Sequence, residues 1–175
     1  GIFELRPFYW KNKKKIDIFK NKKTLKHLLK SYSYLFKNTS SGYPPIIKAN
    51  YTKTSFSLGD KSDKILFKTV ELKHGKTSTN AYIFEKTAYV SDCNDFDIVK
   101  NKAFKDLNHL IIDCLKFDKH PSHFSLDDIL LIHKKLNPKK TVLTNLHHDL
   151  DYDKLLKILP KNMIPAYDGL SLNLV

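Results

Sequence analysis

The chain has 175 residues, of which 41% are hydrophobic, so it is long enough to bury the core of one domain of ordinary size. No window approaches the roughly 18 uninterrupted apolar residues of a membrane span, and no secretory leader is visible near the start. Two cysteines without a Cys-x-x-Cys spacing exclude a disulfide framework and a thiolate zinc site. We therefore expect a soluble cytoplasmic protein that has no membrane partner.

The formal net charge of +13 raises the question of a nucleic-acid partner, because a basic face gains affinity by releasing counterions from phosphates. Almost all of this charge is lysine, and Arg6 is the only arginine, whereas phosphate and base recognition favour the forked guanidinium. The lysines are spread along the whole chain, and the densest run, 11–15, is typical of a solvated loop. A general bias toward lysine is therefore favoured over a nucleic-acid patch, which stays as an alternative.

In the first half of the chain, the apolar run 16–19 follows the lysine-rich loop. Thr24 is predicted to be the N-cap of a helix with apolar residues at helical spacing. The positions that define this spacing are Leu25, Leu28, Leu29, Tyr32 and Leu35. Beyond a loop at 38–45, five short segments separated by glycine, aspartate and lysine turns predict a mostly antiparallel sheet. These segments are 47–51, 54–58, 65–72, 81–84 and 88–90.

After Asp92 the pattern changes to alternating helices and strands, which predicts a layered α/β or α+β architecture. Ser125 and Asp128 resemble a capping box, with aspartate in place of the usual glutamate. The sequence contains no glycine-rich phosphate loop, so it gives no support for a doubly wound nucleotide-binding fold. The predicted elements are a helix near 97–107, a strand at 110–112, a helix at 126–136, a strand at 141–144, a helix at 152–159 and a closing strand at 170–175.

Several strand ends carry histidine or aspartate, the residue types that gather chemistry where strands pass into loops. His74 follows the strand 65–72 and is either a metal ligand or a loop residue without a functional role. Asp92 ends another strand and either bridges two cations or caps the next segment. Asp113 ends the buried strand 110–112, so we expect its carboxylate to emerge at the same edge of the sheet as His74 and Asp92.

Four further polar positions lie in the C-terminal third. His120 and His123 flank Pro121, which favours an extended or turn geometry that lets the two rings converge. Asn145 and His147 face the same side if the extended conformation of strand 141–144 continues, and His148 then faces away. The remaining histidines are interpreted as structural or exposed, and these are His27, His109 and His133.

Imidazole and carboxylate groups together suit Zn, Mn or Fe. The sequence offers no serine or cysteine nucleophile with a paired base. We therefore expect metal-assisted hydrolysis as the reaction class.

A family resemblance rests on several segments taken in chain order, namely Lys73-His74-Gly75, 89–92, 112–114, 120–127, 143–147, 149–152 and 165–169. Together they resemble a metallo-β-lactamase-fold hydrolase. Within that superfamily they are most similar to the phosphodiesterase branch that includes the accessory enzyme of phosphonate breakdown acting on a ribose cyclic phosphate. The resemblance covers essentially the whole chain, and it implies an αββα sandwich with a dinuclear site at the edge where the loops meet.

Carried over residue by residue, the resemblance implies that His74 binds one metal ion and that Asp92 bridges two divalent ions, Zn or Mn. It implies that His123 donates to the substrate phosphate or protonates the leaving alkoxide. His120 and Asp113 would support this role.

Two departures from the family pattern affect these assignments. The His-x-His-x-Asp-His motif that supplies most ligands is absent, and Gly1–Phe8 resembles what normally follows it. In addition, Asn145 stands where a Thr-His pair commonly places the last ligand. By the two-residue strand period His147 would take its place as the metal ligand, in preference to His148, and Asn145 could bind the metal weakly through its amide oxygen.

We therefore expect residues 1–175 to form the C-terminal two-thirds of a single metallo-β-lactamase-fold domain. The predicted function is metal-dependent hydrolysis of a small phosphodiester, such as a cyclic phosphate, with little or no activity from these residues alone. An exposed sheet edge predicts aggregation or a homodimer. The alternatives are a nuclease of the same superfamily and a non-catalytic, lysine-rich nucleic-acid-binding module.

Overall fold

The computed structural model describes residues 1–38, 42–51, 54–60 and 62–174. The chain divides into two compact units, Gly1–Phe56 and Ser57–Val175. In the part of the chain that the structure describes, no helix has the length and hydropathy required of a membrane span.

The first unit is built on two short parallel strands, β1 (Ile16–Lys20) and β2 (Ile47–Tyr51). Its small core contains Leu35, Ile46 and Ile47, all almost fully buried. The predicted apolar run 16–19 and the predicted strand 47–51 are thus confirmed, although they pair with each other and lie outside the larger sheet. The other elements of this unit are η1 (Ile2–Leu5), α1 (Arg6–Asn12), α2 (Lys22–Ser31) and η2 (Ser33–Leu35).

Helix α2 begins earlier than its sequence pattern predicts. Its N-cap is Asn21, whose side chain accepts a hydrogen bond from the backbone N–H of Thr24 at 2.9 Å, so the assignment of Thr24 as the cap is wrong. The helix ends at Ser31, and Leu35 belongs to the following 3-10 turn. Helix α1 was not predicted, and it takes in the start of the run interpreted as a loop. Pro7 in its first turn was the available signal.

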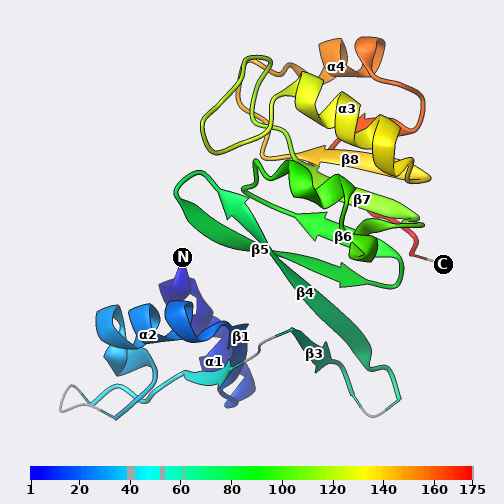
Figure 1. The fold of residues 1–175 in the computed structure, drawn as a ribbon. Helices are drawn as coiled ribbons and strands as arrows, with labels where there is room; N and C mark the ends of the chain where they lie inside the picture. The colour runs from blue at the N-terminus through cyan, green and yellow to red at the C-terminus, as the bar shows by residue number, and fades with distance from the viewer. Residues whose placement is uncertain (39–41, 52–53, 61, 175) are drawn as a thin grey trace. The chain divides into compact units, whose positions relative to one another are not determined.

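The second unit contains most of a seven-stranded sheet in the order β3-β4-β5-β6-β7-β8-β9 (Figure 1). Strands β4, β5 and β6 pair antiparallel, whereas β6, β7, β8 and β9 pair parallel. This combination confirms the predicted mixed α/β fold. The bounds are β3 (Ser55–Leu58), β4 (Ile65–His74), β5 (Thr77–Phe84), β6 (Thr87–Val90), β7 (His109–Asp113), β8 (Lys140–Thr144) and β9 (Met163–Pro165).

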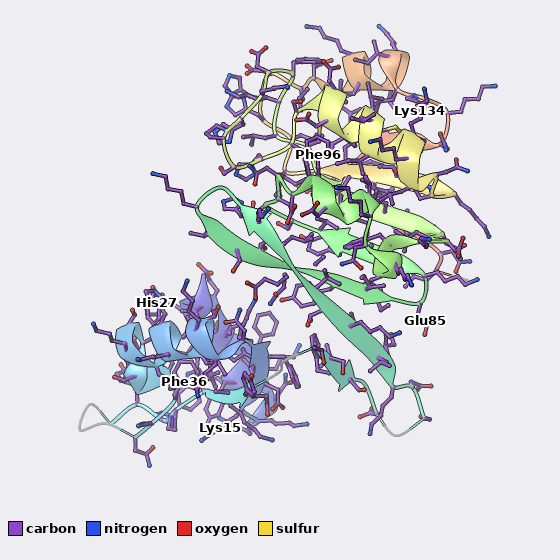
Figure 2. All side chains as sticks on the ribbon, in the orientation of Figure 1. Lys15, His27, Phe36, Glu85, Phe96 and Lys134 are labelled. Atoms are coloured by element: carbon purple, nitrogen blue, oxygen red, sulfur yellow. The ribbon has the colours of Figure 1, made fainter. Side chains whose placement is uncertain are left out.

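Helix α3 (Leu126–Leu136) runs beside the parallel strands and closes the main core (Figure 1). The predicted capping box is confirmed, because the Ser125 hydroxyl accepts from the Asp128 N–H and the Asp128 carboxylate accepts from the Ser125 N–H. Ile129 and Ile132 are fully buried on the inner face, whereas Lys134 points outward (Figure 2). Helix α4 (Tyr152–Ile158), capped by Asp151, also confirms its prediction.

Two predicted elements are wrong. The expected helix at 97–107 is two 3-10 turns, η3 (Phe96–Val99) and η4 (Lys102–Phe104). Asp95 and Asn101 each accept from the N–H two residues onward, and such local hydrogen bonds compete with a continuous helix. Residues 170–174 contain no strand, and residue 175 lies outside the described part. The last parallel strand is instead β9, which was not predicted.

His133 on α3 links the helix to the sheet. Its Nδ1 lies 2.8 Å from the Thr141 hydroxyl of β8, and both residues are buried. Burial disfavours the imidazolium and lowers the pKa of His133 from its ordinary value of 6.5. The folded state therefore binds protons more weakly than the unfolded chain. The contribution of His133 to the free energy of unfolding is complete above about pH 6.5 and is lost as the pH falls toward the folded-state pKa.

We predict that the melting temperature falls between about pH 7.5 and pH 5.5, and that His133→Gln reduces this fall, because glutamine does not titrate. Differential scanning fluorimetry at the two pH values measures it. His27→Gln, at an exposed histidine of α2, is the matched control and should behave as the wild type. An undiminished fall in His133→Gln would contradict the prediction.

Candidate metal centre

The directions of the strands collect polar residues at one edge of the sheet. Strands β6, β7 and β8 are parallel neighbours, in which Val90 pairs with Ile112 and Asp113 pairs with Thr144. Because β4 and β6 are both antiparallel to β5, β4 also ends at this edge, and its last residue is His74. The carboxyl ends of parallel strands are the usual location of sites in open α/β sheets.

Asp113 is the buried centre of this group. Its side chain is fully buried and accepts hydrogen bonds from the Cys93 N–H at 3.3 Å, the Asn145 amide at 3.1 Å and the His123 Nδ1 at 2.7 Å. A buried carboxylate requires such partners, since an unpaired buried charge is strongly unfavourable. Asp113 therefore lies at the predicted edge of the sheet, but its carboxylate stays fully buried and does not emerge from the core as predicted.

Two histidines have their protonation sites fixed by their acceptors. The His74 Nδ1 lies 2.6 Å from the Asp92 carbonyl oxygen, which only accepts, so Nδ1 carries the proton. The same reasoning applies to the His123 Nδ1 beside the Asp113 carboxylate. Both rings therefore keep a free lone pair on Nε2 when neutral, and their centroids are 4.7 Å apart.

His120 lies next to these two residues. Its ring centroid is 5.2 Å from that of His123, and its Nδ1 is 3.3 Å from the Ser122 hydroxyl. Partial burial, followed by the charges of His123 and Lys116, lowers the pKa of His120. The predicted convergence of His120 and His123 across Pro121 is therefore present.

Asn145 connects the two carboxylates. Its side-chain N–H groups lie 3.2 Å from Asp92 Oδ1 and 3.1 Å from Asp113 Oδ1, with Ser91 Oγ at 3.3 Å. Its backbone is left-handed, with a φ of 58°, so the extended conformation of β8 does not continue beyond Thr144. The side-by-side placement expected of Asn145 and His147 is consequently not found.

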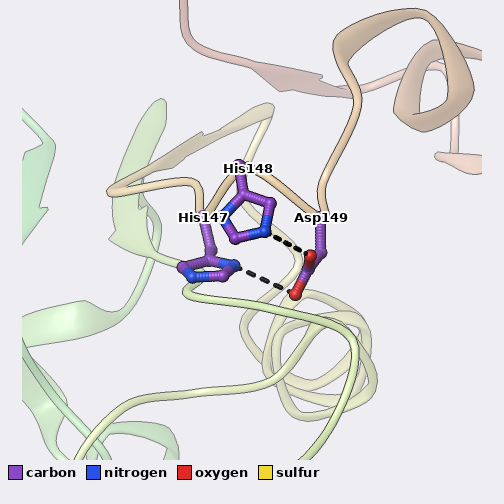
Figure 3. Close-up of side chains that lie close together, drawn as sticks. All are labelled: His147, His148 and Asp149. Carbon is purple, nitrogen blue, oxygen red and sulfur yellow. Dashed lines mark hydrogen bonds and ion pairs between the residues drawn. The ribbon is translucent and has the colours of Figure 1, made fainter.

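His147 instead contacts His148 and Asp149 (Figure 3). The structure therefore brings together six of the seven predicted site residues and places His147 in a different group. The six are His74, Asp92, Asp113, His120, His123 and Asn145.

Asn94 was missed by the sequence analysis, although it joins two loops of the site. Its side-chain oxygen accepts from the Gly75 N–H at 3.0 Å, and its amide donates to the Pro121 carbonyl at 2.9 Å. Gly75 is required at its position, because its φ is +57° and an added Cβ would lie 2.9 Å from the Ser122 Cβ. A lone asparagine after Asp92 gives no sequence signal of this bridge.

The donor chemistry of the site fits a divalent metal ion. Asp92, Asp113 and His123 each offer one ligand atom, and these atoms lie within 4.8 Å of one another. Carboxylate and imidazole donors together suit Zn and Mn. Asp92 is exposed and His123 partly buried, so the group opens to solvent on one side.

The two cysteines do not compete as nucleophiles. Both are free and fully buried, and burial raises the pKa of Cys93 and of Cys114 to about 12, with nearby carboxylates adding to the shift. A thiol in this state is unreactive at neutral pH.

A histidine and aspartate cluster at the carboxyl edge of a mixed sheet lies where open α/β sheets usually carry their sites. Residues 1–147 match the family described as a beta-lactamase superfamily domain. The chain belongs to this superfamily, whose members include metal-dependent hydrolases of the metallo-β-lactamase fold. The comparison with curated proteins found no match.

Solved structures agree with this assignment. A crystal structure of a diphosphatase from the PhnP family is 26% identical with a TM-score of 0.75, and the match covers 89% of this chain and 57% of that one. The chain thus spans little more than half the length of that enzyme. The metallo-beta-lactamase fold protein YhfI from Bacillus subtilis is 14% identical with a TM-score of 0.69, covering 97% of this chain and 71% of that one. Human tRNase Z, short form, is 14% identical with a TM-score of 0.58, covering 93% and 69%. These last two show the fold alone.

Asp113→Asn should destabilise the second unit by about 1–3 kcal/mol, because the new amide turns a donor toward groups that already donate. Urea denaturation monitored by circular dichroism measures this loss of stability. Tryptophan fluorescence is not suitable, because Trp10 lies in the first unit. Asp97→Asn is the control. Its carboxylate is 65% exposed beside Lys73 and Lys100, so its loss should change stability by less than about 0.5 kcal/mol. Equal midpoints for Asp113→Asn and the wild type would refute the prediction.

Proposed function

We propose that the chain is part of a metal-dependent hydrolase that acts on small phosphodiesters, and that it supplies the residues that contact the substrate. The observation that carries this proposal is the convergence of His74 and Asp92 with the Asp113–His123 pair at the carboxyl edge of the sheet. The similarity to a diphosphatase of the PhnP family supports phosphorus chemistry in particular.

The metal ligands in this proposal are His74, through its free Nε2, and the exposed carboxylate of Asp92. The cofactor is a pair of divalent ions, Zn or Mn. When bound, these ions supply Lewis acidity toward a phosphate oxygen and neutralise its charge. The Asn145 amide donates to both the Asp92 and the Asp113 carboxylates and so fixes their positions relative to each other.

His123 is the proposed proton donor. Asp113 fixes its Nδ1 as a donor and thereby turns Nε2 away from the buried carboxylate. An imidazolium at this point donates a proton to a leaving alkoxide, and the adjacent buried carboxylate stabilises its positive charge. His120 contacts the His123 ring and therefore lies on the same side of the proposed site.

A nuclease of the same superfamily is the second candidate. The observation that favours it is the excess of 31 lysines and arginines over 18 acidic residues. A polynucleotide substrate would release counterions, so its apparent affinity should fall steeply with salt. A small phosphodiester should show little salt dependence.

The first experiment measures hydrolysis of bis(p-nitrophenyl) phosphate and of a ribose cyclic phosphate with added Mn²⁺ or Zn²⁺. It compares this chain with a version that includes any residues encoded upstream of Gly1, because the match covers 57% of the diphosphatase. We expect metal-dependent turnover in the extended version. His123→Ala should reduce it by about 100-fold or more, as expected for the loss of a general acid.

His27→Ala is the matched control, since it removes an exposed imidazole from the first unit. It should leave turnover unchanged. Absence of turnover in both versions with either metal would refute the hydrolase proposal. Turnover of RNA alone, with a steep salt dependence, would replace the small phosphodiester by a polynucleotide.

A further inference from the structure

The net charge of the chain is concentrated in its first unit. The lysines are spread along the whole sequence, but the acidic residues are not. Gly1–Phe56 contains 13 of the 31 lysines and arginines and only two of the 18 acidic residues, Glu4 and Asp17. The first unit therefore carries a formal charge of +11 out of the total of +13. A general bias toward lysine would add positive charge to both units, but it would not remove aspartate and glutamate from one of them.

Two hollows on the surface of the first unit gather part of this charge. The first has a volume of about 520 Å³ and lies between α2 and the end of β2, where it is lined by Lys22, Leu25, Lys26, Leu29 and Tyr51. The second has a volume of about 340 Å³ and is lined by Leu29 again, with Lys15, Phe36, Lys37, Ile47, Lys48 and Ala49. The two hollows therefore meet at Leu29 and form one groove beside β2, which we call the β2 groove.

The floor of the β2 groove is apolar and aromatic. Ile47, Ala49 and Tyr51 are alternate residues of β2, so they lie on the same face of the strand. Helix α2 contributes Leu25 and Leu29, because residues four positions apart lie on one face of a helix. The Tyr51 side chain is 60% exposed, so its ring is available to stack on a planar ligand.

The charged side chains of the β2 groove are all lysines. Five lysines line it, and none of the described residues in its lining is acidic. Within the described part of the chain, the only ion pair that these five lysines form joins Lys48 Nζ to Asp17 Oδ1 at 3.6 Å. The other four ammonium groups therefore remain available to an anionic ligand.

We propose that the β2 groove binds a single-stranded nucleic acid. The lysines bind its phosphates and Tyr51 stacks on one of its bases, since a basic groove with an aromatic platform binds single strands irrespective of their sequence. An anionic membrane surface fits less well, because the apolar side chains line a hollow, whereas membrane binding requires an apolar face that enters the lipid. The inference concerns binding by the first unit and does not depend on the proposed hydrolase activity.

Fluorescence anisotropy of the 175-residue chain with a labelled oligouridine of about 12 nucleotides tests the proposal. Lys22→Ala combined with Lys26→Ala should weaken binding by about tenfold or more at low salt. The slope of log K against log salt should become shallower by about 1.4, since each phosphate contact on a single strand contributes about 0.7. Denaturing gel electrophoresis of the probe after each titration shows whether it was cut, so binding and hydrolysis are scored separately.

Lys134→Ala combined with Lys135→Ala is the matched control. It removes the same charge from exposed positions of α3 in the second unit. It should retain the wild-type salt slope and an affinity within about twofold of the wild type, because neither lysine contacts the strand. An unchanged affinity and salt slope in the Lys22 and Lys26 double variant would overturn the proposal.

Tyr51→Ala separates base stacking from charge. It should weaken binding of the oligouridine by about fivefold or more without changing the salt slope. Tyr51→Phe retains the ring and should bind as the wild type does. An abasic sugar–phosphate strand that binds the wild type as tightly as the oligouridine would overturn the stacking role of Tyr51. Binding to phosphatidylserine vesicles without binding to the oligouridine would overturn the proposal in favour of a membrane surface.

Discussion

The candidate centre depends on the burial of one carboxylate. Asp113 has no exposed surface, and it is stabilised by donors from three different segments, namely the Cys93 N–H, the Asn145 amide and the His123 ring. Each donor lies in a loop that follows a different strand end or connection. A single buried charge thus draws these loops together, because leaving any of its lone pairs unpaired in the core would be unfavourable.

The polar bridges around Asp113 extend this constraint to the edge of the site. Asn94 ties the turn after β4 to the loop that carries Pro121, while Asp95 accepts from the Lys73 N–H at 3.0 Å. His74 is consequently held against the Asp92 carbonyl by backbone contacts on both sides. The exposed Asp92 carboxylate therefore lies among groups that hydrogen bonds hold in place, which is the condition for an effective metal or phosphate site.

Much of this organisation was predictable from local sequence. The strand at β7, the helix α3 with its Ser125 cap and the helix α4 follow from periodicity and capping residues, and parallel strand ends brought Asp92 and Asp113 together. The loops were less predictable, because their conformations depend on tertiary hydrogen bonds. Asn145 turns left-handed, which redirects His147 away from the centre, and no sequence period indicates such a turn. The 3-10 turns at Phe96–Val99 and Lys102–Phe104 were missed because Asp95 and Asn101 satisfy local N–H groups.

The parallel pairing of β6, β7 and β8 also has a consequence for the order in which the protein folds. Val90 meets Ile112, and Asp113 meets Thr144, only after long connections have closed, and closing such loops is entropically unfavourable before the contacts form. The hairpin of β4 and β5, by contrast, is local in sequence. The backbone that carries His74 therefore forms early, whereas the contact of its ring with Asp92 and the Asp92, Asp113 and Asn145 cluster form late. A nascent chain emerging from the ribosome would present isolated histidines and carboxylates long before it presented a chelating site.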